Sequence, residues 1–386
     1  MKLYPHQQKF VDANPRKAIL NWEMRTGKTL PAALWIDHPC RAGNTFIITP
    51  KQNIKDWQRM NTKATIMTKE EFKKKAKDIL WPTALVIDEA HYFASKLFVK
   101  GRSALAENMY NFIKANPDMD ILLLTATPVR QDPWSLHTLL CYIDKYYDWK
   151  KWQEYFFEKK AMRFLARPVW MKAHQVPMAW FPREDWRIKI RKYLEKHTDI
   201  VSLADVVEYL PPPGIRIIKV DTPEYVPSEE EVVSWMHEHQ WEQQNKVSEI
   251  LKLGYKKVIV VCRYTAQIDA FADQLKDDKP VFILDGRTKD PDAVKKAAQD
   301  AEECYFVVQA AMGFGWDGWM FGAIVFASMS HSCLDHTQMI GRPRHLEHIA
   351  PFELIYLIGG RWDQRIYDTI KKGEDFNAHI YLQNAA

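Results

Sequence analysis

The chain has 386 residues, 47% of them apolar and 27% charged, which is a globular composition with enough length for two sizeable hydrophobic cores. This composition excludes a disordered or fibrous protein. The formal net charge of +5 permits a polyanionic partner but does not identify one.

The five cysteines are widely spaced, at Cys40, Cys141, Cys262, Cys304 and Cys333. Because they are odd in number and form no C-x-x-C pair, neither a disulfide framework nor a zinc ribbon is expected. The N-terminal residues lack the apolar stretch of a signal peptide, and no run approaches the roughly 18 apolar residues that span a bilayer. We therefore expect a soluble, cytoplasmic protein that contacts no membrane.

Two stretches of the chain alternate short apolar runs with longer amphipathic segments, the pattern of strands and helices in parallel α/β domains. In the first stretch the predicted strands are residues 17–21, 45–49, 84–88 and 121–125. In the second stretch they are residues 215–220, 257–262, 281–284, 304–308, 323–327 and 353–358. The pattern predicts an α/β fold with two tandem parallel-sheet domains.

Residues 141–197, between these stretches, are basic and aromatic. They contain 14 Lys and Arg against 7 Asp and Glu, interleaved with 14 aromatic residues. The mixed spacing of the aromatic residues predicts helices that pack on more than one side. Residues 211–214, Pro-Pro-Pro-Gly, then indicate a domain junction. We predict a first domain over 1–140, a helical insertion and linker over 141–210, and a second domain over 211–386.

The loop after the first predicted strand has the residues that a phosphate chain requires. Gly27 permits close backbone approach, Lys28 supplies a positive charge, and the Thr29 hydroxyl can hold magnesium. A helical segment follows from Leu30, which places the phosphates at a helix N-terminus. The tripeptide alone is a weak signal, because the earlier glycine of such loops is absent and Arg25 occupies its neighbourhood.

Asp88 and Glu89 strengthen this interpretation. They follow the apolar run 84–87, a predicted buried strand, and ligands of parallel sheets bind at the carboxyl ends of strands. Asp88 can hold magnesium directly or through water, and Glu89 can act as a general base toward the attacking water. Together with Lys28, the pair predicts a nucleotide-hydrolysing site.

The segment Asp88-Glu89-Ala90-His91 and the phosphate loop resemble motifs of superfamily 2 helicases and translocases, in the DEAH-box and Swi/Snf-type branches. The resemblance covers nearly the whole chain and implies two RecA-like lobes that use ATP and Mg²⁺. Leu3-Tyr4-Pro5-His6-Gln7 is similar to the family's adenine-reading segment, which implies that Gln7 contacts adenine and that Tyr4 stacks near it. The implied phosphate-binding residues are Arg25, Thr26, Gly27, Lys28 and Thr29.

The second predicted domain resembles the part of the family that supplies arginines to the γ-phosphate. Residues 338–344 resemble the sixth motif, which implies Gln338 as a site residue and Arg342 and Arg344 as arginine fingers. The family's second arginine falls one position later, where this chain has His345. Residues 313–317 are similar to the fifth motif, which adds two cofactor-binding residues, Gly315 and Asp317.

Other segments resemble the family's nucleic-acid-binding motifs, which grip phosphates without reading sequence. In the first domain the implied contacts are Lys51, Thr68, Lys69 and Thr127, the last within residues 124–128, which resemble the third motif. In the second domain they are Arg263, Tyr264, Arg287, Thr288 and Gln309. Gln309 stands where the family has serine or threonine.

The basic aromatic segment has two interpretations, and both stay open. It is either a nucleic-acid platform, in which aromatic rings stack on bases and cations neutralise phosphates, or a helical insertion with a packed core. Swi/Snf-type motors carry helical insertions at this position and use them to grip duplex DNA, which favours DNA over RNA.

These features predict a monomeric, ATP-dependent DNA translocase or helicase that remodels duplex, branched or protein-bound DNA. One alternative is an RNA helicase. Another is a nucleic-acid-binding module with weakened catalysis, which Arg25 and the altered sixth motif suggest. A third is the motor subunit of a larger restriction or repair assembly, with a protein partner. The compact layout also resembles bacteriophage motors, which would place the protein in the host cytoplasm.

Overall fold

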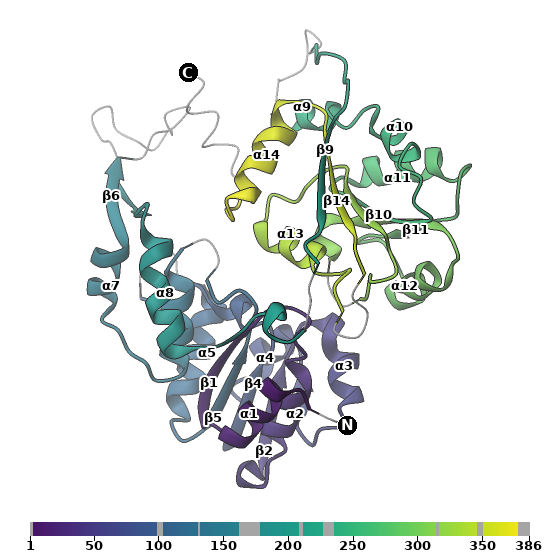
Figure 1. The fold of residues 1–386 in the computed structure, drawn as a ribbon. Helices are drawn as coiled ribbons and strands as arrows, with labels where there is room; N and C mark the ends of the chain where they lie inside the picture. The colour runs from purple at the N-terminus through teal and green to yellow at the C-terminus, as the bar shows by residue number, and fades with distance from the viewer. Residues whose placement is uncertain are drawn as a thin grey trace. The chain divides into compact units, whose positions relative to one another are not determined.

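The computed structural model describes residues 3–98, 103–129, 132–161, 178–207, 211–226, 235–313, 316–345 and 350–376. The chain divides into two compact units, Met1–Glu208 and Tyr209–Ala386, and each is built around its own parallel sheet (Figure 1). The predicted pair of tandem parallel-sheet domains is confirmed, and both units are compatible with a RecA-like fold. No helix among the described residues is long and apolar enough to cross a membrane.

The first unit contains a six-stranded parallel sheet with the strand order β3-β2-β4-β5-β1-β8. Its strands are β1 (Lys17–Trp22), β2 (Asn44–Ile48), β3 (Thr65–Met67), β4 (Pro82–Ile87), β5 (Asp120–Leu124) and β8 (Asp199–Val201). The four predicted strands are confirmed to within two residues at each end. β3 and β8, with three residues each, are not among the predicted strands.

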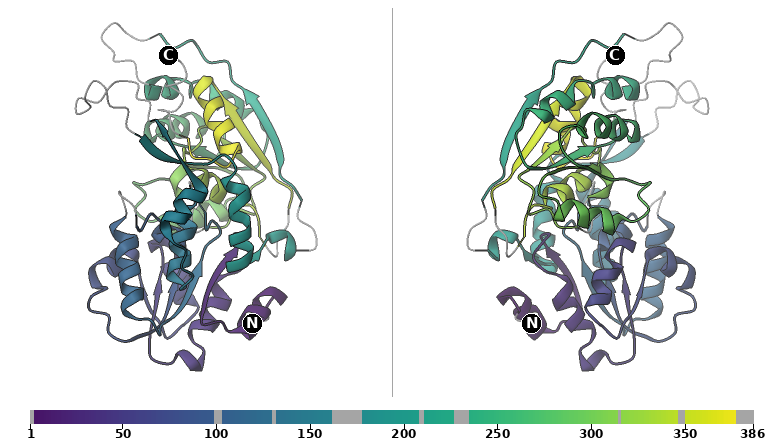
Figure 2. Two further views of the ribbon diagram at one scale, coloured as in Figure 1. Left: turned by 90° about the vertical axis from the view of Figure 1, so that its left-hand side faces the viewer. Right: turned by 90° about the vertical axis from the view of Figure 1, so that its right-hand side faces the viewer.

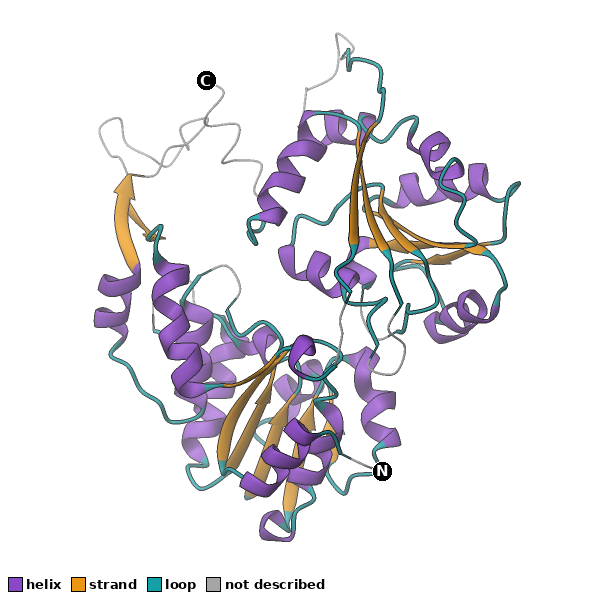
Figure 3. Cartoon of the chain, viewed as in Figure 1, coloured by secondary structure: helices purple, strands orange, loops and turns teal. Residues whose placement is uncertain are grey.

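Helices cover both faces of this sheet, because successive strand residues point to opposite sides and both sides are apolar (Figure 3). On one side, Ile47, Val86 and Leu122 share a buried cluster with residues of α1 (Pro5–Ala13), α2 (Thr29–Ile36) and α3 (Ile54–Arg59). On the other side, Ile48 and Ile87 share a cluster with residues of α4 (Lys69–Lys75), α5 (Ala104–Ala115) and α6 (Trp134–Tyr142). Burial on both faces explains why these strands are almost entirely apolar.

A separate helical insertion over residues 141–210 is not confirmed. The described part of this segment contains α7 (Trp149–Phe156) and α8 (Trp186–His197), but also an antiparallel hairpin of β6 (Phe157–Ala161) and β7 (Met178–Pro182). The segment then supplies β8, which pairs with β1 in the first sheet. Trp152 and Phe156 belong to the same buried cluster as Ile87, so the segment is packed into the first unit.

The second unit contains a parallel sheet with the order β11-β12-β10-β13-β14-β9. Its strands are β9 (Gly214–Lys219), β10 (Lys257–Cys262), β11 (Val281–Leu284), β12 (Cys304–Gln309), β13 (Ala323–Phe326) and β14 (Glu353–Ile358), all at their predicted places to within one residue. Helices again lie on both faces (Figure 2). They are α9 (Trp235–Trp241), α10 (Lys246–Leu251), α11 (Thr265–Leu275), α12 (Pro291–Asp300), α13 (Cys333–Ile340) and α14 (Arg361–Lys371).

Candidate nucleotide site

The carboxyl ends of β1, β2, β4 and β5 lie at one edge of the first sheet, because these strands are parallel. The segments that leave this edge carry residues 23–28, Thr49, 88–91 and 125–127. The predicted phosphate loop, acidic pair and third motif are therefore brought to the edge where parallel sheets bind ligands.

Two residues with left-handed backbone conformation shape the loop between β1 and α2. The Thr26 amide donates to the Glu23 carbonyl at 3.4 Å, and Arg25 stands within this turn at φ 68°, followed by Gly27 at φ 75°. Left-handed backbone is unstrained for glycine but costs roughly 1–2 kcal/mol for other residues. The absence of an earlier glycine therefore does not abolish a left-handed turn, because Arg25 adopts that conformation under strain.

The start of α2 presents a row of unpaired backbone amides. Those of Gly27, Lys28, Thr29 and Leu30 donate to no acceptor among the residues that the structure describes. Successive amides at a helix N-terminus bind phosphate oxygens, because the helix dipole adds to their partial positive charge. Residues 27–30 thus fit the phosphate chain of a nucleotide.

The N-terminal helix α1 is fastened to this loop through Gln7. Its Nε2 donates to the Gly27 carbonyl at 2.9 Å, and its Oε1 accepts from the Tyr4 amide at 2.9 Å. His6 adds a second link, with Nε2 at 2.9 Å from the Thr26 carbonyl. The structure therefore brings Tyr4 and Gln7 to the phosphate loop, and the contact of either residue with adenine stays a prediction.

Lys28 folds back onto the end of β1. Its Nζ donates to the carbonyls of Trp22 at 2.7 Å and Glu23 at 3.1 Å. Burial lowers the pKa of Lys28, while the carboxylates of Glu89, Asp88 and Glu23 act in the opposite direction. The ammonium is held in a partly desolvated position near the acidic pair, where phosphate oxygens can replace the two carbonyls.

Asp88 is held at the end of β4 by three donors. Thr49 Oγ1 at 2.8 Å, Trp57 Nε1 at 3.0 Å and Asn53 Nδ2 at 3.1 Å all donate to Oδ2. Burial raises the pKa of Asp88, and the charge of Glu89 raises it further. The other oxygen, Oδ1, receives no hydrogen bond from any described residue. The carboxylate is thus oriented by one oxygen and available through the other.

The residues present fit a divalent cation of the Mg²⁺ type. Mg²⁺ prefers oxygen ligands and is held in nucleotide sites by one or two protein oxygens together with the phosphates. Asp88 Oδ1 is such a ligand, and a cation beside it would favour the charged carboxylate, whose pKa is raised by burial and by repulsion from Glu89. The Thr29 hydroxyl, at the first residue of α2, is the second predicted ligand.

Glu89 is connected through His91 to Thr125 and Thr127, in the segment predicted as the third motif. Glu89 adopts φ 50°, and its Oε2 lies 3.2 Å from Nδ1 of His91, which is 1% exposed. The same nitrogen lies 3.4 Å from Thr125 Oγ1 and 3.5 Å from Thr127 Oγ1. Thr127, a predicted nucleic-acid contact, is therefore within reach of the histidine that contacts the predicted general base.

The other predicted nucleic-acid residues of the first unit differ in their surroundings. Lys51 is exposed at the start of the short helix after β2. Thr68 caps α4, since its hydroxyl accepts from the Glu71 amide at 3.1 Å, and it is only 9% exposed. Lys69 lies over the ring of Tyr92 at 4.8 Å. Lys51 has the environment expected of a backbone contact, whereas Thr68 has a capping role that accounts for its residue type.

In the second unit, Arg342 links the two segments predicted as the fifth and sixth motifs. Its Nε donates to the Gln338 carbonyl and its Nη1 to the Trp316 carbonyl, both at 3.0 Å. Arg342 is 8% exposed and Gln338 2% exposed, whereas Arg344 is half-buried. The Asp317 carbonyl accepts from Gln299 Nε2 at 2.8 Å. Gly315 lies outside the described residues.

Three predicted contacts of the second unit hold one turn after β11. Arg287 forms ion pairs with Asp269 at 2.7 Å and with Asp285 at 2.6 Å. The Thr288 hydroxyl accepts from the Asp285 amide at 3.0 Å, and Gln309 Oε1 accepts from the Gly286 amide at 3.1 Å. Four of the five N–H groups of Arg287 donate to these carboxylates, so a phosphate contact could use the remaining Nη1 hydrogen or replace a carboxylate partner.

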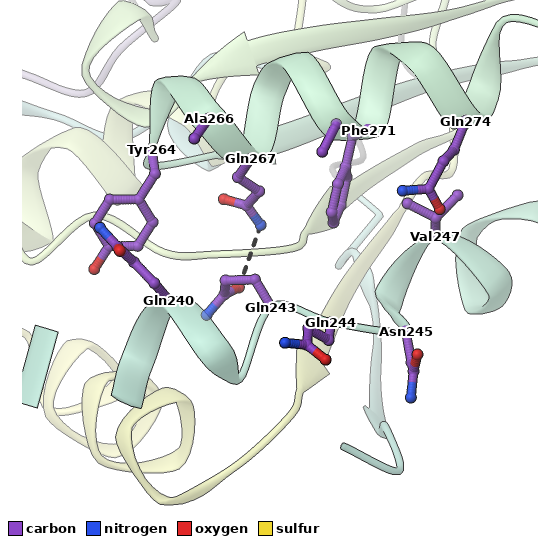
Figure 4. A pocket seen from close by; sticks show the side chains of 11 residues that line it. Gln240, Gln243, Gln244, Asn245, Val247, Tyr264, Ala266, Gln267, Phe271 and Gln274 are labelled. Atoms are coloured by element: carbon purple, nitrogen blue, oxygen red, sulfur yellow. Dashed lines mark hydrogen bonds between the residues drawn. The ribbon is translucent and has the colours of Figure 1, made fainter. Parts of the chain in front are cut away.

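Tyr264, which follows Arg263 after β10, borders a cavity of about 270 Å³ (Figure 4). Tyr264 lines it together with carboxamides, of which Gln267 donates to Gln243 at 3.2 Å. The Arg263 amide donates to Ser328 Oγ at 2.7 Å. These bonds fix the backbone after β10.

A buried ion network lies next to this cavity. Lys246 Nζ donates to Asp363 Oδ2 at 2.5 Å, and Asp363 Oδ1 lies 3.0 Å from His239 Nε2, with all three side chains fully buried. His239 Nδ1 in turn lies 2.8 Å from the Tyr264 hydroxyl. His239, Glu242 and Asp363 are close enough together to bind a metal ion, but the Lys246 ammonium already supplies the positive charge that Asp363 needs.

Several residues that build the first-unit site have no role predicted from the sequence. His6, Asn53 and Trp57 contact the phosphate loop or Asp88 through hydrogen bonds. His91 stands within the acidic motif, so its position after Glu89 was the available signal. Asn53 and Trp57 lie 35 and 31 residues before Asp88, and no local pattern indicates such contacts.

No protein-family model matches this chain, and comparison with curated proteins gives no match. The functional interpretation of the site therefore depends on the geometry of its own residues.

Proposed function

We propose that this protein is an ATP-hydrolysing motor that moves on nucleic acid, with DNA as the preferred polymer. The observation that carries the proposal is the group formed by the amides of residues 27–30, the ammonium of Lys28 and the carboxylates of Asp88 and Glu89. A phosphate-binding helix N-terminus, a cation ligand and a general base are the three requirements of nucleoside triphosphate hydrolysis.

Each residue has one role in this proposal. The amides and Lys28 bind the phosphate chain, while Asp88 and Thr29 would hold Mg²⁺, which neutralises phosphate charge when bound. Glu89 accepts the proton of the attacking water, and its contact with His91 Nδ1 at 3.2 Å orients the carboxylate. Arg342 and Arg344 keep their predicted role of stabilising charge on the γ-phosphate.

The link from Glu89 through His91 to Thr125 and Thr127 supports a motor over a simple ATPase. A shift of Glu89 during hydrolysis changes the contacts of a fully buried histidine, which also lies near the two threonine hydroxyls. Packed networks with discrete arrangements transmit such changes. The proposal therefore places the coupling between hydrolysis and nucleic-acid contact in residues 88–91 and 125–127.

Hydrolysis assays with a panel of polymers test the proposal. We expect phosphate release from ATP to be stimulated by DNA more than by RNA, and to require Mg²⁺. Lys28→Ala should abolish hydrolysis, and Arg342→Ala and Arg344→Ala should show which arginine contributes. RNA as the better stimulator would assign the protein to the RNA helicases. Absence of hydrolysis with every polymer would reject the motor in favour of a binding module.

A further inference from the structure

Residues 149–161 and 178–197, which contain α7, β6, β7 and α8, have a net charge equal to that of the whole protein. The described residues 149–161 and 178–197 contain ten Lys and Arg against five Asp and Glu, a net of +5, which equals the formal charge of the complete chain. The rest of the sequence therefore sums to zero. A local excess of this kind raises the concentration of polyanions near these four elements.

The aromatic residues of these elements fall into two groups. Trp152, Phe156 and Phe157 are at most 3% exposed and belong to the core of the first unit. Tyr155, Phe181 and Trp180, in contrast, are 39%, 39% and 37% exposed. The inner group belongs to the core, whereas the outer rings are mostly at the surface, although the Tyr155 ring lies edge-on to the Phe156 ring at 4.9 Å.

Two of these outer rings, Tyr155 and Trp180, are bordered by lysines. Lys189 and Lys192 of α8 lie over the ring of Tyr155 at 5.0 and 4.9 Å, and Lys192 Nζ donates to its hydroxyl at 3.1 Å. Lys159 stands opposite Trp180 in the hairpin register and lies 5.4 Å from its ring. These five residues form a surface that combines ring faces with ammonium groups. We call this surface the basic hairpin face.

The two parts of this face are close in the chain. Tyr155 precedes Lys159 by four residues, so their Cα atoms are at most roughly 14 Å apart. The hairpin continues directly from the end of α7, since β6 begins at the residue after α7 ends. The two parts of the face therefore lie within a distance that a few nucleotides can span.

We propose that the basic hairpin face binds unpaired nucleotides, with bases stacked on Tyr155 and Trp180 and phosphates neutralised by Lys159, Lys189 and Lys192. Single-strand binding without sequence preference uses this combination of aromatic platforms and a positive surface. Bases inside a duplex are already stacked on each other, so the face selects single strands and frayed ends. The inference rests on the proposed function only for the role of this binding in a motor.

The charge and the rings of this face favour a nucleic acid over a second copy of the chain or a lipid surface. A second copy of the chain would bring a net of +5 against a net of +5, which opposes association through this face. An anionic lipid surface would satisfy the lysines but supplies no stacked bases. The presence of one ring within each lysine group therefore favours single-stranded nucleic acid.

Fluorescence anisotropy of labelled 12-nucleotide oligo(dT) and oligo(U), without ATP, tests the proposal. Tyr155→Ala and Trp180→Ala should each weaken binding about 5- to 100-fold, the range of one lost base–ring stack. Tyr155→Phe and Trp180→Phe should retain the affinity, because they keep an aromatic ring. Trp81→Ala removes a ring that is 86% exposed before β4, and it should change binding less than about twofold as the matched control.

An abasic oligonucleotide separates stacking from charge. Wild type should bind it as weakly as the double variant Tyr155→Ala/Trp180→Ala binds oligo(dT), and that double variant should lose little further affinity for it. Equal wild-type affinity for abasic and normal strands would overturn the proposal. Unchanged oligo(dT) binding by the alanine variants would also overturn it. The proposal would likewise fail if these variants bound oligo(dT) normally but lost affinity for phosphatidylserine vesicles or for a second copy of the chain.

The result is distinguishable from failure of the proposed function. Lys28→Ala should keep the dependence of oligo(dT) binding on Tyr155 and Trp180, because the nucleotide loop is a different part of the first unit. If no polymer stimulates ATP hydrolysis while this dependence persists, the motor is rejected and the face is supported. If hydrolysis is stimulated by DNA but the alanine variants bind oligo(dT) normally, the face is rejected and the motor is supported.

Discussion

Replacing Lys28 by Met should separate the stability of the first unit from its ability to bind nucleotide. The substitution removes two hydrogen bonds, to the carbonyls of Trp22 and Glu23, each worth about 1 kcal/mol net. It also removes a charge that burial disfavours, since the pKa of Lys28 is lowered in the fold. These effects oppose each other, so we expect the free energy of unfolding to stay within about 1 kcal/mol of wild type.

The substitution should abolish nucleotide binding, and this loss can be measured as missing stabilisation of the fold by nucleotide. At a concentration 100 times the dissociation constant, a ligand that binds only the folded state adds about 2.7 kcal/mol to the free energy of unfolding. Urea denaturation with and without Mg²⁺ and a slowly hydrolysed ATP analogue should show this gain in wild type and in Lys77→Met, an exposed-lysine control. Lys28→Met should show none of it.

Two outcomes would refute this reasoning. A loss of more than about 2 kcal/mol in Lys28→Met without nucleotide would mean that the two carbonyl bonds support the fold, against the balance argued above. Absence of any nucleotide-dependent stabilisation in wild type would mean that residues 27–30 do not bind a phosphate chain under these conditions.

Three further predictions concern catalysis, the buried ion network and pH. Glu89→Gln should lower the turnover of ATP about 100- to 10,000-fold while nucleotide-dependent stabilisation persists, and unchanged phosphate release would reject Glu89 as general base. Asp363→Asn should reduce the free energy of unfolding by about 3–5 kcal/mol, because it leaves the fully buried Lys246 ammonium without a carboxylate. In urea denaturation, the double variant Lys246→Met/Asp363→Leu should recover most of this loss. Burial lowers the pKa of His336 to about 4, so the unfolded chain takes up a proton first as pH falls, and stability should decline by about 3 kcal/mol between pH 6.5 and pH 4. His336→Phe should be less sensitive to pH across that window, and equal slopes for the two proteins would contradict the assignment.

The strands that were predictable are those buried on both faces. Residues 84–87 and 121–124 are uninterrupted apolar runs, which is the composition that burial on two sides requires. β3 and β8 have three residues each, too few for a periodic pattern, and both lie at sheet edges where one neighbour is missing. The hairpin strand β6 reads Phe-Glu-Lys-Lys-Ala, whose charges are typical of a solvated helix face as much as of a strand.

The site was predictable where it depends on consecutive residues and not where it depends on contacts between distant ones. Residues 27–29 and 88–89 stand beside strand ends, so their position follows from the strands themselves. Arg287 shows the opposite case. Its guanidinium is bound by Asp269, 18 residues earlier, and only the packing of α11 beside β11 brings that carboxylate within 2.7 Å.

Arg25 shows why an atypical residue in a motif is a poor guide to lost function. A glycine in a loop motif indicates a backbone conformation that other residues adopt only with strain, and φ 68°, the value at Arg25, is such a conformation. The strain of another residue there, roughly 1–2 kcal/mol, is small enough for the rest of the first unit to support. The sequence difference therefore does not by itself favour the binding module with weakened catalysis over the motor.

The sequence could not decide between a packed core and a nucleic-acid platform for the basic aromatic segment, because buried and exposed aromatic residues are neighbours in the same helix. Tyr155 and Phe156 are consecutive, and successive helical residues point about 100° apart, so one reaches solvent while the other reaches the core. Composition counts both rings alike. Once burial separates them, the packed-core interpretation applies to Phe156 and the nucleic-acid interpretation to Tyr155. Substitution of the outer rings should consequently leave the fold intact, which is what makes the binding experiment on this face informative.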